Sequence, residues 1–244
     1  MIEPIVQLVY RASTTTLPGI TNDNAQGLIF EDANLFSFNR FSGTDRQETG
    51  LRLNVGGQYQ ADFADGSWLR LIGGQSFQLA GVNSFSIFDH GQTGNSSGLE
   101  TANSFVVAGL QAGFSPGIEV GAKFEYDVAA SSIVRGALAS EVDISGYKLS
   151  ADYYFLAAKP ARGVLNDTHT LRASVGIPVA EYWTLNAGGT TDIVAANWTK
   201  ANIGLVYDDN YLTYGADYEA SQNLNTLKID HRFWLTFALK GLSE

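Results

Sequence analysis

The sequence predicts an all-β fold, an antiparallel transmembrane β-barrel with about twelve strands in this chain. Apolar and polar residues alternate with a period of two along most of the chain, the pattern of strands that have one apolar face. The alternating segments are about 9 to 14 residues long, enough for a tilted strand to cross a bilayer and longer than most strands in soluble sheets. Short turns and longer polar loops alternate between the segments, as they do in outer-membrane barrels.

Composition supports this class. Charged residues make up 16% of the 244 residues, well below the ~25% typical of soluble domains. The mean hydropathy is −0.04, and the chain has no run of ~20 apolar residues for a spanning helix. A net charge of −10 disfavours nucleic acid as a partner, because phosphates require a basic surface. The absence of cysteine from the sequence excludes disulfides and thiolate metal sites.

The strands can be followed along the chain. Residues 1–10 lack the basic and continuous apolar regions of a signal peptide and have the pattern of a strand, so we expect a fragment or a processed product. The clearest amphipathic segments are 50–63, 118–128, 146–156 and 229–239. Their apolar faces consist of Leu51, Leu53, Val55, Tyr59, Ala61 and Phe63; Ile118, Val120, Ala122, Phe124, Tyr126 and Val128; Tyr147, Leu149, Ala151, Tyr153 and Phe155; and Ile229, Phe233, Leu235, Phe237 and Leu239.

The connections differ in length. Residues that favour tight turns predict turns at 64–66, 115–117, 143–145 and 208–210. Longer polar loops are expected at about 13–49, 80–99, 157–167 and 221–226. Because the two kinds alternate, the turns should lie at one end of the sheet and the loops at the other.

The polar faces of the strands would line the interior of such a barrel, because hydrocarbon cannot satisfy polar groups and the apolar faces must meet lipid. We expect these charged residues to face the lumen: Arg52, Asp62, Glu119, Lys123, Glu125 and Asp127. They could constrict a pore, as charged rings do in channels, or form a solvated wall. Aromatic residues near strand ends would suit interfacial girdles, namely Trp68, Trp183, Tyr211 and Tyr214. The alternative fold is a soluble β-sandwich whose apolar faces pack together.

The sequence offers little for catalysis or for metal binding. None of the histidines, His90, His169 and His231, has the spacing of a metal motif, so we expect no metal and no cofactor. A catalytic alternative is an outer-membrane phospholipase in which His169 or His231 activates a serine, but no serine lies in a G-x-S-x-G pattern. We therefore expect no catalytic residues and no enzyme.

One stretch departs from the alternation. Residues 33–50, ANLFSFNRFSGTDRQETG, combine aromatic, charged and turn-forming residues in neither a helical nor a strand pattern. A loop of this composition can fold back onto the mouth of a barrel, bury its aromatic rings and pair an arginine with Asp45.

This stretch resembles the family of the lipopolysaccharide assembly protein LptD, also called the organic solvent tolerance protein. The similar text is IEPIVQLVY at 2–10, LFSFNRFSGTDRQETGLRLNVGGQY at 35–59, GQSFQL at 74–79 and YDDNYLTYGADY at 207–218. Its most specific part is a loop signature made of Asn39, Arg40, Phe41, Gly43, Asp45 and Arg46.

The resemblance implies that residues 1–244 are the C-terminal portion of a larger barrel, in the outer membrane of a Gram-negative bacterium, with extracellular loops and periplasmic termini. Residues 33–50 would be an extracellular plug-like loop and residues 227–240 the last strand. The implied function is transport and insertion of lipopolysaccharide into the outer leaflet. The implied partners are lipopolysaccharide, outer-membrane lipids, a plug lipoprotein of the LptE type, and periplasmic bridge proteins that dock on an N-terminal domain absent from this sequence.

Two further roles follow from the resemblance, each with an alternative. In the family the substrate leaves between the first and last strands, so a lateral gate would include Phe233, Leu235, Phe237 and Leu239, although an ordinary closing strand has the same pattern. Arg40 and Arg46 could bind lipopolysaccharide phosphates instead of fixing the loop, since arginine matches phosphate geometry. The alternative function for the whole chain is a passive porin-type diffusion channel.

Overall fold

The computed structural model describes residues 1–12, 29–42, 46–87, 94, 96–160, 164–223 and 226–240. Within these residues the chain forms twelve strands and one 3-10 turn, η1 (Asp32–Asn34). The strands are β1 (Ile2–Arg11), β2 (Gly50–Asp62), β3 (Trp68–Ala80), β4 (Val106–Phe114), β5 (Ile118–Asp127), β6 (Ser132–Ile144), β7 (Tyr147–Leu156), β8 (Thr168–Ala180), β9 (Trp183–Asp192), β10 (Asn197–Asp208), β11 (Leu212–Gln222) and β12 (Ile229–Leu239).

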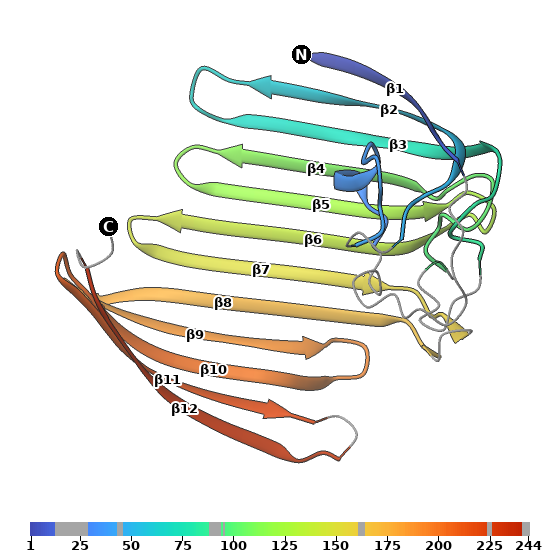
Figure 1. Ribbon diagram of the computed structural model, residues 1–244. Coiled ribbons are helices and arrows are strands. Elements are labelled where there is room, and N and C mark those ends of the chain that lie inside the picture. The colour runs from blue at the N-terminus through green and yellow to red at the C-terminus, as the bar shows by residue number, and fades with distance from the viewer. Residues whose placement is uncertain are drawn as a thin grey trace. The chain divides into compact units, whose positions relative to one another are not determined.

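The strands lie in the sheet in the same order as in the sequence, from β1 to β12 (Figure 1). Pairing is antiparallel in β1–β2, β2–β3 and from β7 through β12. The prediction of an all-β antiparallel sheet with about twelve strands is therefore confirmed. No helix in the described residues is long and apolar enough to cross a membrane.

The chain divides into two compact units. The first consists of Met1–Ala112, Ala122–Gly136 and Lys159–Leu165, and the second of Gly113–Gly121, Ala137–Ala158 and Asn166–Glu244. The first unit contains the whole of β1, β2 and β3, together with η1. The second contains the whole of β7 to β12.

In the first unit a tight turn joins β2 to β3, as predicted. Gly66 has a φ of +86°, which a residue without a Cβ adopts freely, and the Phe63 amide donates to the Ser67 carbonyl at 2.8 Å. The predicted loop at 80–99 is longer in the structure, because β4 begins only at Val106. Before that point the Ser104 amide donates to the Ser76 carbonyl and holds this part of the chain along the end of β3.

In the second unit the turn at 115–117 lies between β4 and β5 as predicted, whereas two other predicted turns lie slightly later than expected. β6 continues to Ile144, because Gly146, with a φ of +83°, makes the turn after it. β10 continues to Asp208, and Asp209 then accepts hydrogen bonds from the amides of Tyr211 and Leu212. A further tight turn at 193–196, where Asp192 caps two amides, was not among the sequence predictions.

Many of the large apolar residues of the strands are exposed. On β12 the side chains of Phe233, Leu235 and Phe237 are 67%, 72% and 68% exposed. On β2 the two faces differ sharply, since Asn54 is fully buried whereas its neighbour Val55 is 37% exposed. This arrangement is the reverse of a soluble sandwich, in which the apolar faces would be covered.

The hydrophobic core belongs to the first unit. It consists of Phe30, Leu35, Phe41, Phe85, Leu99 and Val107, none of which comes from the apolar face of an amphipathic strand named above. Most of these residues lie in the connections before β2 and between β3 and β4. The loops therefore supply the core, and they pack on the polar side of the strands.

Candidate functional site

The site is built by the chain between β1 and β2. Residues 29–42 and 46–49, here called the covering segment, lie against the polar face of β2 and β3. Gly74 of β3 leaves room for Leu35, because a Cβ at that position would lie 2.8 Å from the Leu35 Cδ2 atom. Gly109 of β4 leaves room for Asp32 in the same way. Glycine on these strands thus lets the segment approach the sheet backbone closely.

A buried charge cluster joins the covering segment to β2. The Arg40 guanidinium donates to the Glu48 carboxylate through Nε at 2.9 Å and Nη2 at 2.7 Å, and both side chains are at least 95% buried. Arg52 of β2 donates through Nη1 to the same carboxylate. Its Nη2 donates to the carbonyls of Ser37 and Phe38 at 2.6 and 3.0 Å. Glu48 therefore binds two cations that come from different parts of the chain.

A chain of hydrogen bonds continues from this cluster across the first strands. Arg40 Nη2 donates to Ser76 Oγ at 3.3 Å, and Ser76 Oγ donates to Asn54 Oδ1 at 2.6 Å. Asn54 donates to Gln7 Oε1 at 2.6 Å, and Gln7 donates to the Phe36 carbonyl at 3.0 Å. The path runs from β3 through β2 to β1 and returns to the covering segment.

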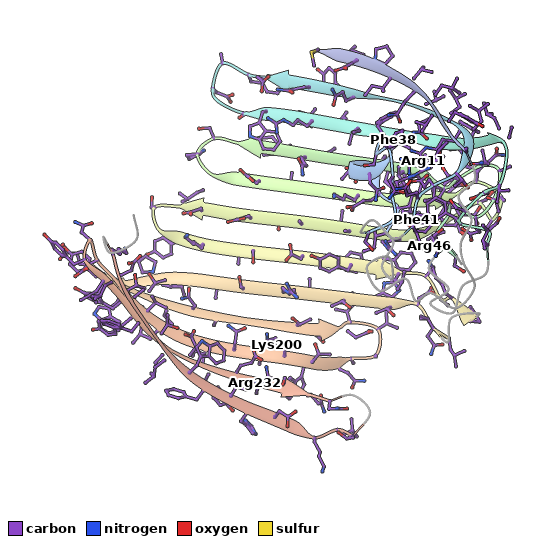
Figure 2. The ribbon with its side chains drawn as sticks, in the orientation of Figure 1. Arg11, Phe38, Phe41, Arg46, Lys200 and Arg232 are labelled. Atoms are coloured by element: carbon purple, nitrogen blue, oxygen red, sulfur yellow. The ribbon has the colours of Figure 1, made fainter. Side chains whose placement is uncertain are left out.

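Aromatic rings surround the cations. The Phe41 and Phe85 rings stack with centroids 4.3 Å apart, and the Arg40 guanidinium lies 5.3 Å from the Phe30 centroid. The Arg46 guanidinium lies 4.3 Å above Phe41 and donates to the Ser84 carbonyl at 3.1 Å. Figure 2 shows Phe41 and Arg46 at the same end of the strands as Arg11 and Phe38, another arginine and ring in contact at 4.3 Å.

Burial sets the ionisation of the cluster. Loss of water lowers the pKa of Arg40 to about 9, which is still above neutral pH, so the group remains a cation. Its Nη1 atom is buried and makes no hydrogen bond within the described residues. A polar cavity of about 10 Å³, the size of one water molecule, is lined by Arg40, Ser76 and Ser84 among others.

The loop signature is only partly visible. Gly43 and Asp45 lie outside the described residues, so the expected pairing of an arginine with Asp45 has no counterpart there. Asn39 connects the two parts of the covering segment: its Nδ2 donates to the Arg46 carbonyl at 3.0 Å, and its Oδ1 accepts from the Glu48 amide at 3.0 Å.

Sequence reasoning missed Glu48, Phe30 and Phe85. Glu48 lies within the quoted stretch and four residues before Arg52. The sequence shows that it is acidic, but it does not show that Arg40 and Arg52 are its partners. Phe30 and Phe85 lie in loops on either side of β2 and β3, where no periodic pattern marks a buried residue.

The charged residues predicted to face a lumen have different surroundings. Arg52 is buried in the cluster, and Lys123 lies 3.2 Å from Glu31 and 3.5 Å from Asp32 of the covering segment. Glu125 pairs with Arg135 at 2.9 Å. The other three are separate: Asp62 accepts from Gln60, Glu119 is exposed, and Asp127 caps the amides of Ala129 and Ala130.

The second unit carries a charged cluster on the polar face of its strands and an aromatic cluster on the apolar face. On the polar face, Lys200 of β10 lies 2.6 Å from Glu219 of β11, and Arg232 of β12 lies 3.9 Å from it (Figure 2). At the turn end of the apolar face, Trp183 packs edge-on against Tyr214 with centroids 5.4 Å apart, and Tyr207 stacks on Tyr214 at 4.9 Å.

The remaining aromatic predictions fall in different places. Tyr211 is 76% exposed at the β10–β11 turn. Trp68 lies under the Arg70 guanidinium at 4.8 Å. Of the histidines, His90 lies outside the described residues, and His169 and His231 each bind a tyrosine.

Comparison with known proteins relates this chain to one family. A family model described as LptD, LPS transport system D, matches residues 1–183. The match covers the covering segment, its cluster and strands β1 to β8, and it ends before β10 to β12. No curated protein matches the sequence.

Proposed function

The chain belongs to the LPS transport system D (LptD) family, whose members are transport barrels that carry lipopolysaccharide to the outer membrane and are not enzymes, and on this premise we propose that it inserts lipopolysaccharide into the outer leaflet as the C-terminal portion of such a barrel. The observation that carries the proposal is the direction of the apolar side chains. Leu8 and Tyr10 of β1 and Leu235 and Phe237 of β12 are all more than 60% exposed. A surface of this kind is stable in lipid and costly in water.

The apolar face of the second unit has the height that a membrane requires. On β8 it extends from His169 near the loop end to Val179 near the turn end. These residues are ten positions apart, which corresponds to about 33 Å along a strand and about 23 Å for a strand tilted by 45°. The value agrees with the apolar band of outer-membrane barrels, which is roughly 25 Å tall.

We propose that the loops are extracellular and that the turns and termini are periplasmic. Support comes from the unequal connections, since the turn end carries tight turns at 63–67 and 145–146 whereas the other end carries the long connections at 12–49 and 81–105. Short periplasmic turns and long outer loops are usual in this class.

The covering segment, which holds most of the proposed plug-like loop 33–50, has a structural role in this proposal. Arg40 is too deeply buried to reach a lipid phosphate unless the covering segment opens. Its guanidinium N–H groups already donate to the Glu48 carboxylate. Arg46 is also buried, beside Phe41. Their burial favours pairing over direct contact with lipopolysaccharide.

The partners in the proposal rest on the family. A plug lipoprotein of the LptE type would occupy the barrel, and periplasmic bridge proteins would deliver the substrate to an N-terminal domain. The lumen would be lined by the polar faces, with Arg52, Asp62, Glu119, Lys123, Glu125 and Asp127 among their charges.

We also propose that β12 forms one side of a lateral gate through Phe233, Leu235, Phe237 and Leu239. The sheet order supports this, because β12 is the last strand of the sheet and pairs with β11 along one edge. The alternating exposed rings of this strand could contact acyl chains as they enter the membrane.

Site-specific photo-crosslinking in cells tests the function. A photoreactive residue at Asn202, on the polar face of β10, should crosslink to lipopolysaccharide only while the periplasmic supply operates. The matched control is Ala173 on the apolar face of β8, where crosslinks to membrane lipopolysaccharide should persist after the supply stops. A porin would give no crosslink at Asn202 and a steady ion conductance that a plug lipoprotein leaves unchanged.

A further inference from the structure

Two histidines of the second unit have the same local structure. The Tyr153 hydroxyl of β7 lies 2.7 Å from Nδ1 of His169 on β8, and the Tyr218 hydroxyl of β11 lies 2.6 Å from Nδ1 of His231 on β12. In both pairs the rings are also close, with centroids about 6 Å apart (6.1 and 6.0 Å). The same arrangement thus occurs in two separate hairpins.

Both histidines lie on the apolar face, at its loop end. His169 is the second residue of β8 and follows the loop at 157–167, and His231 is the third residue of β12 and follows the connection at 223–228. Side chains two apart on a strand share a face, so His169 aligns with Leu171 and Val175, and His231 with Phe233 and Leu235. The opposite, turn end of this face carries the Trp183 and Tyr214 rings instead.

The tyrosine hydroxyl leaves one ring nitrogen available. When the hydroxyl donates to Nδ1, the neutral imidazole carries its proton on Nε2, and this N–H needs an acceptor. The described residues provide no hydrogen bond for Nε2 of either histidine. In hydrocarbon such a group would be costly, but at the rim of the apolar band the lipid headgroups begin, and phosphate oxygens are strong acceptors there.

We propose that His169 and His231 each bind a lipid headgroup phosphate through Nε2, oriented by Tyr153 and Tyr218. This inference rests on the proposed membrane-spanning function, because it requires the apolar face to be in lipid with the loop end at the outer surface. The ligand is a phosphate ester of the outer leaflet, and its source is either a phospholipid or lipopolysaccharide.

Solid-state NMR can observe the contact directly. Protein labelled with ¹⁵N-histidine is reconstituted into phosphatidylglycerol bilayers, and the dephasing of each Nε2 signal by ³¹P is measured. His169→Phe and His231→Phe assign the two signals. In a second sample, lipopolysaccharide in a phosphate-free glycolipid host is the only source of ³¹P, so the two samples distinguish the sources.

We expect ³¹P dephasing of both Nε2 signals in at least one sample. Tyr153→Phe and Tyr218→Phe each remove the hydroxyl but keep the ring, and should lower the ratio of phosphate-bound to free histidine on their own hairpin roughly fivefold, the equivalent of one ordinary hydrogen bond. Tyr214→Phe, at the turn end of the same face, is the matched control and should change neither signal.

The absence of Nε2 dephasing in both samples, with protein that is folded and inserted, would overturn the proposal and leave the transport function untouched. Failure of the wild-type protein to insert, judged by heat-modifiable migration in gels, would instead count against the proposed function. Dephasing that survives both tyrosine substitutions would remove the orienting role of the hydroxyls.

Discussion

Arg40 and Glu48 form a fully buried ion pair, with hydrogen bonds of 2.7 to 3.1 Å between the guanidinium and the carboxylate. The same carboxylate also accepts from Arg52, so one acid compensates two buried bases. Since an unpaired charge in such a place is very costly, Glu48 determines whether the covering segment can remain on the sheet.

Glu48→Gln should therefore destabilise the protein strongly. Removal of one partner from a buried pair costs about 3–5 kcal/mol, because the remaining charges lose their compensation. The measurement is the free energy of unfolding in detergent micelles, combined with amide hydrogen exchange of residues 29–42. Glu119→Gln, at an exposed position of β5, is the control and should stay within about 0.5 kcal/mol of the wild type. Equal effects of the two substitutions would contradict the assigned role of Glu48.

Phe41 and Phe38 should respond differently to truncation. Phe41 is 4% exposed and stacks on Phe85, so Phe41→Ala should cost about 3–5 kcal/mol through lost burial and a cavity. Phe38 is 56% exposed, and Phe38→Ala should lose only its contact with Arg11, about 0.5–1 kcal/mol. Equilibrium denaturation of both variants checks the difference, and a larger loss for Phe38→Ala would refute the packing described above.

Asp65 gives the β2–β3 turn a dependence on pH. Hydrogen bonds from the Ser67 amide and hydroxyl, at 3.0 and 3.1 Å, lower the pKa of this carboxyl below its ordinary value. A lowered acid pKa stabilises the folded turn at pH values above the unfolded pKa of about 3.9, and this contribution disappears as the pH falls through the folded pKa.

The midpoint for Asp65 can be read from ¹³C carboxyl shifts during an acid titration. It should lie below that of an unstructured aspartate, and Ser67→Ala should raise it by removing the hydroxyl donor. A midpoint that Ser67→Ala leaves unchanged would show that the hydroxyl plays no part.

The faces of β12 can be mapped by cysteine substitution, because the sequence contains no native cysteine. Spin labels at 233, 235 and 237 should be more accessible to oxygen, which concentrates in lipid. Labels at 232, 234 and 236 should be more accessible to a water-soluble nickel reagent. A pattern without this alternation, or with the opposite phase, would exclude the membrane orientation proposed here.

Periodicity made the strands predictable. Apolar and polar residues alternate in any strand whose two faces have different environments. This alternation located β2, β5, β7 and β12 to within about two residues. The loops were harder, because their order depends on contacts between distant parts of the chain. The pairing of Glu48 with Arg52, and of Phe41 with Phe85, has no period that a reader of the sequence could detect.

The composition of residues 33–50 indicated a packed stretch with buried aromatic rings. The burial of Arg40, Phe41 and Arg46 agrees with that expectation, whereas the Phe38 ring is 56% exposed. The identity of the acidic partner was not predictable. Two acids lie close together in the stretch, and only the fold places Glu48 beneath the Arg40 guanidinium.

Asn39 makes two hydrogen bonds that matter for engineering this protein: its side chain donates to the Arg46 carbonyl and accepts from the Glu48 amide. These bonds tie the chain before position 43 to the chain after position 45. A short epitope inserted between Ser42 and Arg46 would therefore be held on both sides, and would report which side of the membrane this segment occupies in intact cells.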